Sequence, residues 1–476
     1  SPTRSRDGRT IPSPALRANS SSPRVMASAA RVSLLLLLLG LPLAAPAASS
    51  DDGDETSLLQ VTRGGVRARR AARGRGRQIP TYPKPTVNLR TVLAPSFVVD
   101  LDAPPEQRWQ NVTRHYKALG AFPTCCDATP AQLRAFKLVL SVMPVPDEYR
   151  RELLGIVADV GHPDVTLESL LIRNVGYELT GSWQTTEEIV NGSGTLFNDW
   201  QADFFGPVQG CSGLLAAMEN GTVVHGRNMD LEEGHFNSSV TGKRLHWADV
   251  TIEVLFIKGG KPFIVSVHWP GMTGFHTAMR FGGWSFEQNT RWHGIMPDVL
   301  FGLLRHSEGF AWRSRRVMES TPDFDTALQR LNRSNLMAPS YFILAGAKPY
   351  EGAVLTLDRG NERLEGTPPV FRLVNGTMPL AVNLTQPGWR FVQTNDDYLE
   401  EPLDDRRVYE EPNLNWAKQW AVNPKWMFKE MTTAYLMTNI TIFNTVYVPS
   451  TGFYQTKVFA DNWKNGAIFK LPIPPP

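Results

Sequence analysis

The chain of 476 residues contains only three cysteines, Cys125, Cys126 and Cys211. So few cysteines exclude a scaffold held by disulfides, and a large buried core has to stabilise the fold instead. Neighbouring cysteines rarely bridge each other, because a vicinal disulfide strains the peptide. A bridge from either of them to Cys211 would leave one thiol over. We therefore expect Cys211 to be free.

An excess of charge of one sign is also missing. Lysine and arginine number 49 against 46 acidic residues, and residues 63–77 hold seven of the arginines with no acid. Outside that tract the chain is mildly acidic, so we expect no nucleic-acid partner. Metal-ligand spacing is absent too, because four of the histidines lie too far apart along the chain, and we expect no metal and no cofactor. These four are His225, His268, His276 and His293.

Long apolar runs are confined to one place. Met26 begins MASAARVSLLLLLLGLPLAAPAASS, in which a leucine run follows Arg31 and the pattern Ala45-Pro46-Ala47 follows the run. We interpret residues 26–48 as a secretory signal peptide, with an uncleaved anchor as the alternative. Residues 1–25 contain no Met and read as leader or upstream sequence.

Residues 49–79 mix acidic and Arg/Gly-rich tracts and are expected to be a disordered linker. The run 67–70 within it is either a processing site or part of a solvated basic linker. Eight acceptor sites for N-glycosylation follow, well above the chance number, and predict a lumenal route. They are Asn111, Asn191, Asn220, Asn237, Asn332, Asn375, Asn383 and Asn439.

Helical patterns come first along the chain and strand patterns later. We expect helices over 104–119, 132–142, 147–160 and 166–179, after a first strand at 86–89. Strands are expected over 250–257, 262–268, 342–344, 353–357, 389–393 and 441–448, with helical insertions at 297–305 and 325–331. This order favours an α+β sandwich over alternating βαβ units.

The segment from Cys211 to Asp230 predicts a β-hairpin, because Asn220-Gly221 is a strong turn signal between two apolar runs. With those two residues as the loop, Asp230 lies opposite Cys211. Arg227 then faces Leu214 and the other side of the sheet, unless a bulge near Gly226 turns it back.

Cys211 followed by GRNMD at 226–230 resembles the acid ceramidase and N-acylethanolamine acid amidase family. These proteins are related to the cholylglycine hydrolases and share the N-terminal-nucleophile fold, an αββα sandwich. Further segments match in the family's order and extend the resemblance over residues 84–460. They are PPEQRWQNVTRHY at 104–116, GYEL at 176–179, APSYFILAG at 338–346, EGAVLTLDR at 351–359, VQTND at 392–396 and DDRR at 404–407.

The resemblance implies a zymogen cut between Gly210 and Cys211, whose new terminal amine takes and returns the thiol proton. Residues 80–210 would form a helical α fragment and 211–476 the catalytic β fragment. Asp230 would hold the ammonium group and Arg227 would stabilise the thiolate. The resemblance gives Asn395 as an oxyanion donor, Asn289 as a polar neighbour of the nucleophile and Arg406 as an arginine bordering the site.

Ordinary structural roles remain for these residues. Asp230 and Arg227 would also suit a cross-strand pair, Asn395 a turn cap before two aspartates, and Arg406 a solvated charge cluster. The chain departs from the family in two ways. Thirty-one residues separate Leu179 from Cys211 where the family has almost none, and Gly213 stands where the family favours a hydroxyl residue. We interpret the added loop, 180–210, as a plug over the immature site.

The resulting expectation is a self-processed, lumenal cysteine amidase that hydrolyses a fatty-acyl amide lipid, a ceramide or an N-acylethanolamine, with transient contact to a membrane surface. Its location would be a lysosome-like acidic compartment or the extracellular space. The alternative is a secreted glycoprotein of the same fold that binds lipid without turnover. The retention of Cys211, Arg227 and Asp230 argues against it, because decaying enzymes usually lose such residues first.

Overall fold

The computed structural model describes residues 91–122, 140, 143–178, 210–231, 235–291, 307–360, 370–381, 384–399, 405–433, 435–438 and 440–459. All of them belong to one compact unit, Glu55–Pro476. Several expectations lie outside the described residues: the signal peptide, the linker, the strand at 86–89, the helices at 132–142 and 297–305, the cysteines at 125 and 126, and almost all of the 180–210 loop.

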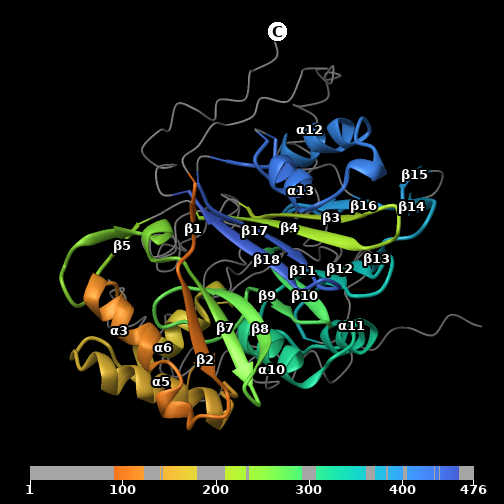
Figure 1. Cartoon of the computed structure of the whole chain (residues 1–476). Coiled ribbons are helices and arrows are strands. Elements are labelled where there is room, and N and C mark those ends of the chain that lie inside the picture. The colour runs from red at the N-terminus through yellow and green to blue at the C-terminus, as the bar shows by residue number, and fades with distance from the viewer. Residues whose placement is uncertain are drawn as a thin grey trace, which may run out of the picture. The chain divides into compact units, whose positions relative to one another are not determined.

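Two β-sheets form the centre of this unit (Figure 1). The first has six strands in the order β1-β18-β17-β4-β3-β16. Its strands are β1 (Val92–Leu93), β3 (Ser212–Ala217), β4 (Val223–Asp230), β16 (Arg390–Gln393), β17 (Thr441–Val448) and β18 (Phe453–Val458). All neighbours in this sheet are antiparallel.

The second sheet has eight strands in the order β13-β12-β11-β10-β9-β8-β7-β2. They are β2 (Ser96–Asp100), β7 (Ile252–Lys258), β8 (Lys261–His268), β9 (Thr277–Arg280), β10 (Trp284–Thr290), β11 (Ser340–Gly346), β12 (Gly352–Leu357) and β13 (Phe371–Arg372). Two small hairpins lie apart, β5 (His235–Asn237) with β6 (Arg244–His246), and β14 (Thr377–Ala381) with β15 (Leu384–Pro387).

Helices cover the outer face of each sheet (Figure 1). Above the first sheet lie α12 (Asp405–Leu414), which contacts β16, and α13 (Pro424–Met431), which contacts β4 and β17. Below the second lie α3 (Gln110–Leu119), α5 (Asp147–Val160), α6 (Leu167–Asn174), α10 (Phe310–Ser320) and α11 (Phe324–Asn332), with α11 on β11 and β12. Short 3-10 helices are η1 (Pro105–Gln107), η3 (Trp247–Val250) and η4 (Gln419–Ala421). The expected αββα sandwich is therefore confirmed.

Most of the expected elements within the described residues are present. Helix α5 has the expected bounds, because Asp147 and Glu148 in its first turn complement the helix dipole and its apolar side faces the core. The helix expected at 104–119 is divided into η1 and α3. The helix expected at 166–179 begins with a capping box formed by Thr166 and Ser169, and it ends as an α-helix at Asn174.

The part of the chain before Gly210 supplies an edge strand to each sheet, paired with strands from the part that follows. Strand β1 pairs with β18 at one edge of the first sheet, and β2 pairs in parallel with β7 at one edge of the second. The Tyr116 hydroxyl donates to the carbonyl oxygens of Val250 and His268 at 3.0 and 3.3 Å. A cut before Cys211 would thus leave two fragments joined by both sheets.

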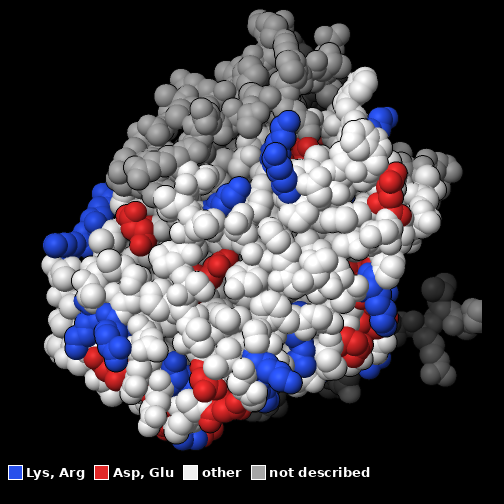
Figure 2. All heavy atoms as spheres, in the orientation of Figure 1, with Lys and Arg blue, Asp and Glu red and all other residues white. Residues whose placement is uncertain are grey.

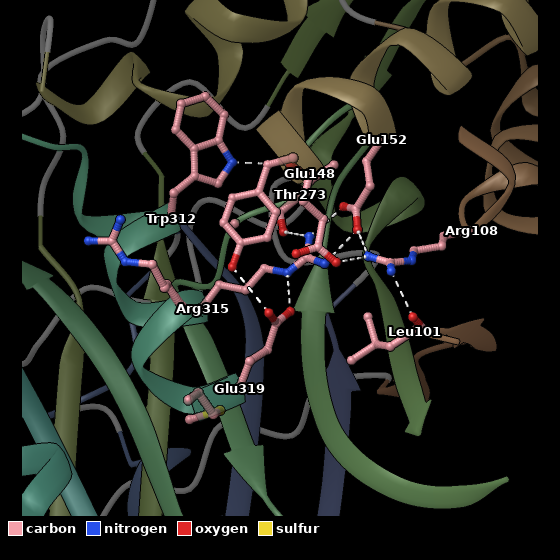
Figure 3. Close-up of polar contacts among 12 residues, drawn as sticks. Leu101, Arg108, Glu148, Glu152, Thr273, Trp312, Arg315 and Glu319 are labelled. Carbon is pink, nitrogen blue, oxygen red and sulfur yellow. Dashed lines mark hydrogen bonds and ion pairs between the residues drawn. The ribbon is translucent and has the colours of Figure 1, made fainter. Parts of the chain in front are cut away.

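A buried ion-pair network reinforces this connection (Figure 3). Glu152 on α5 receives two N–H groups of Arg315 on α10, at 2.5 and 2.7 Å, and one each from Arg108 and Trp109 at 3.0 and 2.8 Å. Burial alone would lower the pKa of Arg315, but Glu152 and Glu319 outweigh it and raise that pKa above its usual value. Because removing one partner would leave a buried charge uncompensated, this network holds the two segments in one arrangement.

Charges of both signs are spread over the face drawn in Figure 2. Among the described residues in that view, lysine and arginine alternate with aspartate and glutamate along the lower edge, and uncharged side chains fill most of the centre. No helix in the described part of the chain is long and apolar enough to cross a membrane.

Candidate active site

The hairpin that carries Cys211 is real, but its expected register was wrong by one residue. Met218 and Thr222 close the loop through a 2.8 Å bond from the Met218 N–H to the Thr222 carbonyl, and Gly221 has φ +85°. This is the three-residue loop with a left-handed glycine, not the two-residue turn that the sequence predicts. Gly213 therefore pairs with Arg227, and Ser212 with Asn228.

A shift of one residue moves every side chain to the opposite face of a strand. Arg227 thereby shares the face of Cys211, which looks toward the second sheet, without any bulge at Gly226. Asp230 belongs to the other face, toward Arg406 on α12. The two residues are not a cross-strand pair, because the carboxylate beside Arg227 is Glu287 at 3.2 Å, and that of Asp230 lies 3.5 Å from Arg406.

The thiol of Cys211 is buried at the start of β3 with only 4% of the residue exposed. Arg227 donates an Nη2 hydrogen to the sulfur at 3.4 Å, and the sulfur lies 3.6 Å from that of Met229. Burial raises the pKa of the thiol, Arg227 and the Asp230 backbone N–H lower it, and the charges of Asp230 and Glu287 raise it again. The net pKa is above that of a free cysteine, so the uncut chain holds a protonated thiol at acidic pH.

Arg406 binds the backbone on both sides of the expected cleavage point between Gly210 and Cys211. Its Nη1 donates to the carbonyl oxygens of Gly210 and Cys211, both at 2.9 Å, and to the Ser212 hydroxyl at 3.1 Å. The residue is 8% exposed, which excludes the solvated charge cluster. Gly210 has to be glycine here, since a Cβ would lie 2.0 Å from both Asn395 Oδ1 and Arg406 Nη2.

Both candidate asparagines lie beside these groups. Asn395 accepts from Arg406 at 2.8 Å through Oδ1 and donates to the Thr290 carbonyl at 2.8 Å. Asn289 accepts from Arg227 at 3.0 Å and donates to the Gln393 carbonyl at 3.1 Å. All six candidate residues therefore converge on one buried cluster: Cys211, Arg227, Asp230, Asn289, Asn395 and Arg406.

Sequence reasoning missed a second layer of this cluster. Glu287 on β10 is fully buried between Arg227 and His225, and Ser285 contacts the other nitrogen of that histidine at 2.9 Å. Thr441 donates to Asp230 at 2.6 Å from β17. The signal available was the alternation of polar residues 285, 287 and 289 within WSFEQNT, which resembles a solvent-facing strand but lines the site.

The sites predicted for glycosylation differ in exposure. Asn111, Asn220, Asn237 and Asn375 are exposed and Asn332 is half-buried, while residues 191, 383 and 439 lie outside the described ranges. Within those ranges, no group of three or more His, Cys, Asp or Glu side chains is arranged to hold a metal ion.

Glu178 is a buried acid and the last described residue before Gly210. Its Oε1 accepts from the Phe310 N–H at 2.6 Å, at the start of α10, and its Oε2 is buried without a hydrogen-bond partner among the described residues. Burial raises the pKa of Glu178 from 4.5 to about 7, although the Phe310 hydrogen bond lowers it. The neutral acid is therefore the form that the fold favours.

We expect Glu178→Gln to stabilise the protein at neutral pH and to change little at acidic pH. The raised pKa means that the stability contributed by the neutral acid is complete below about pH 4.5 and is lost as pH rises to about 7. The glutamine stays neutral and keeps an acceptor for Phe310, so its advantage should grow to at most roughly 3 kcal/mol. Thermal unfolding at pH 4.5 and 7.5 measures this, and an equal difference at both pH values would contradict it.

Comparisons with known proteins show what the chain as a whole is similar to. Residues 94–120 match the family model described as the beta subunit of N-acylethanolamine-hydrolyzing acid amidase. These residues precede Cys211, so the match does not locate a subunit boundary at the expected cut. The chain is 26% identical to the N-acylethanolamine-hydrolyzing acid amidase of Caenorhabditis elegans, over 74% of this chain and 88% of that protein.

It is also 24% identical to human acid ceramidase, over 79% of this chain and 88% of the ceramidase. A solved structure of the C. elegans amidase ortholog aligns with a TM-score of 0.41 and 26% identity, covering 50% of this chain and 93% of that one. The matches to both kinds of enzyme span most of their length. These comparisons support the assignment of the chain to the family of acid ceramidases and N-acylethanolamine-hydrolyzing acid amidases.

Proposed function

We propose that this protein is a self-processed cysteine amidohydrolase that cleaves the amide bond of a fatty-acyl lipid, a ceramide or an N-acylethanolamine, into a fatty acid and an amine. Its nucleophile is the thiol of Cys211, freed as a new N-terminal residue by cleavage after Gly210. The observation that carries this proposal is the position of one buried thiol between Arg227 at 3.4 Å and a carbonyl pair held by Arg406 at 2.9 Å.

Processing begins when the Cys211 sulfur adds to the carbonyl carbon of Gly210. The C–N bond breaks, the departing nitrogen takes the thiol proton, and a thioester and a free amine result. Water then hydrolyses the thioester and releases the Gly210 carboxylate and the thiol. Arg406, which donates to the Gly210 oxygen, stabilises the negative charge that this oxygen develops.

Turnover uses the same groups on an external amide. The terminal amine takes the proton of the thiol, the sulfur attacks the acyl carbon, and the C–N bond breaks as the proton passes to the leaving amine. Water then hydrolyses the acyl thioester, which releases the fatty acid and restores the thiol. The two guanidinium groups of Arg227 and Arg406 favour the neutral amine, while Asp230 opposes them and orients it. Asn395 lies beside the former scissile bond with its Oδ1 toward Arg406 and one amide hydrogen on the Thr290 carbonyl, and its second amide hydrogen is the proposed oxyanion donor.

The proposed compartment is lumenal and acidic. Glu178 supports this, because its buried carboxyl group is best accommodated as the neutral acid. Exposed glycosylation sites such as Asn111 and Asn375 agree with a lumenal route. Contact with a membrane surface is part of the proposal, because a fatty-acyl lipid is presented to the enzyme from a bilayer or micelle. The alternative, lipid binding without turnover, gives no reason for a buried arginine against the thiol.

The test is release of fatty acid from two substrates by purified protein held at about pH 5. Palmitoyl ceramide and N-palmitoylethanolamine are presented in mixed micelles, and free palmitate is measured by mass spectrometry. The proposal expects release from at least one of the two. Binding of both lipids with no palmitate released, by protein shown to be cut, would favour the inactive lipid-binding protein.

A further inference from the structure

Gly213 lies directly behind the nucleophile and opposite Arg227 in the hairpin. A Cβ at this position would lie 2.7 and 2.9 Å from the two carboxylate oxygens of Glu287. The hydroxyl residue that the family favours here would therefore collide with Glu287. A side chain at position 213 and the Glu287 carboxylate would occupy the same space, so Glu287 in this orientation requires glycine at 213.

Glu287 divides its carboxylate between two partners. Oε2 lies 2.9 Å from His225 Nε2, and Oε1 lies 3.2 Å from Arg227 Nη1. The other ring nitrogen of His225 contacts the Ser285 hydroxyl at 2.9 Å. Glu287, His225 and Arg227 are all 0% exposed, so this orientation is fixed by packing as well as by bonding.

The guanidinium of Arg227 is thus held through Nη1, while Nη2 faces two sulfurs, that of Met229 at 3.2 Å and that of Cys211. Nη1 donates to the Gln288 carbonyl at 2.9 Å and to Asn289 Oδ1 at 3.0 Å, and it lies 3.2 Å from Glu287 Oε1 in an ion pair that makes no hydrogen bond. Nη2 donates to the Cys211 sulfur at 3.4 Å. The acid therefore places its negative charge against the side of Arg227 that is remote from the thiol.

We propose that Glu287, seated in the space opened by Gly213 and oriented by His225, is a positioning residue that holds Arg227 against the Cys211 sulfur. The inference rests on the proposed role of Cys211 as the nucleophile. Glu287 touches neither the sulfur nor an expected substrate atom. Glu287 acts on the thiol only by way of Arg227. The glycine at position 213 leaves the room that the Glu287 side chain needs.

Other ionisable groups surround this network. Tyr447 on β17 and His276, next to β9, are buried, and burial raises the pKa of the tyrosine and lowers that of the histidine. Both are uncharged in the range in which a thiol titrates. Arg227 and Glu287 are the charged pair beside the thiol from β4 and β10, with Asp230 on the opposite face.

Alkylation of Cys211 by iodoacetamide, followed on its tryptic peptide by mass spectrometry, tests the proposal on uncut full-length protein. If Glu287 anchors Arg227, Glu287→Ala releases the guanidinium and moves the half-maximal pH of alkylation upward, by about one unit. If Glu287 acts only as a nearby negative charge, its loss moves that pH downward. A downward shift or no shift overturns the proposal.

Gly213→Ser supplies an independent arm. The serine alone should slow alkylation at pH 7 about tenfold, and combining it with Glu287→Ala should recover much of that loss, because the collision disappears. If the losses in alkylation rate of the two single variants simply add in the double variant, Gly213 and Glu287 are not coupled. Glu287→Gln, which keeps the shape, should shift the pH in the same direction by less. Glu253→Gln removes a different buried acid, bonded to Thr456, and should leave the profile unchanged.

Alkylation reads the thiol without a lipid substrate. If Glu287→Ala raises the half-maximal pH of alkylation but the wild-type protein releases no palmitate, the proposed function is wrong and the positioning role stands. If the wild-type protein releases palmitate but Glu287→Ala lowers that pH, the proposed function stands and the positioning role is wrong.

Discussion

Cys211→Ala is expected to abolish both the cut and the release of palmitate, leaving a single chain with background hydrolysis. The reason is that one sulfur performs both reactions, the first on Gly210 and the second on the lipid amide. Gel electrophoresis after incubation at about pH 5 and the palmitate assay measure the two losses. Residual activity above that of heat-inactivated protein would contradict a nucleophilic role for Cys211.

The alanine variant should remain folded. Cys211 is a small buried residue at the end of a strand, and the loss of one buried sulfur costs about 1 kcal/mol. Its thermal midpoint therefore serves as the control on the fold. Cys211→Ser is the matched variant, because the hydroxyl keeps the shape but is a weaker nucleophile at acidic pH, so slow cutting and slower turnover are expected.

Asp230→Asn should give the second large effect, a fall in kcat/KM of roughly 10²-fold or more in protein that is fully cut. The substitution keeps the shape but removes the charge that lies 3.5 Å from Arg406, beside the new terminus. Arg406 would then lose the Asp230 carboxylate as a group that orients it toward the carbonyl of Gly210 or toward the amine of Cys211. Cutting itself should slow for the same reason.

Thr441→Val is the matched control for the aspartate. It deletes the 2.6 Å hydrogen bond to Asp230 and leaves the charge, so a loss of about tenfold or less is expected. Equal kinetics for Asp230→Asn and wild type would reduce Asp230 to a structural partner of Arg406. Equal losses in both variants would mean that orientation, and not charge, is what the site requires.

The parts of the fold that the sequence predicted are those with strong local signals. Helix α5 has an apolar stripe and acids in its first turn, and β17 has a run of β-branched and aromatic residues, so both were placed correctly. Strand β10 was missed because Ser285, Glu287 and Asn289 point inward, which reverses the usual polar and apolar faces. Helix α12 was missed because DRRVYEEPNL has little apolar content and contains Pro412.

The six candidate residues lie together in the structure, as the sequence led us to expect, but their geometry was not predicted. A local motif identified Cys211, Arg227 and Asp230, but their faces depend on one residue of loop length at Gly221. The pairing of Gly213 with Glu287 joins positions on two different sheets, and a single sequence carries no sign of that contact. Sequence reasoning recorded Gly213 as a departure from the family, and the fold supplies its physical reason.

The position of the cut tests the central claim most directly. Purified precursor is incubated at about pH 5, and the N-terminal peptide of the larger fragment is sequenced by mass spectrometry. The account predicts an unblocked cysteine, Cys211, at that terminus, and no such peptide from Cys211→Ala. A different terminus, or palmitate release by a chain that stays whole under acid, would contradict the terminal-amine mechanism.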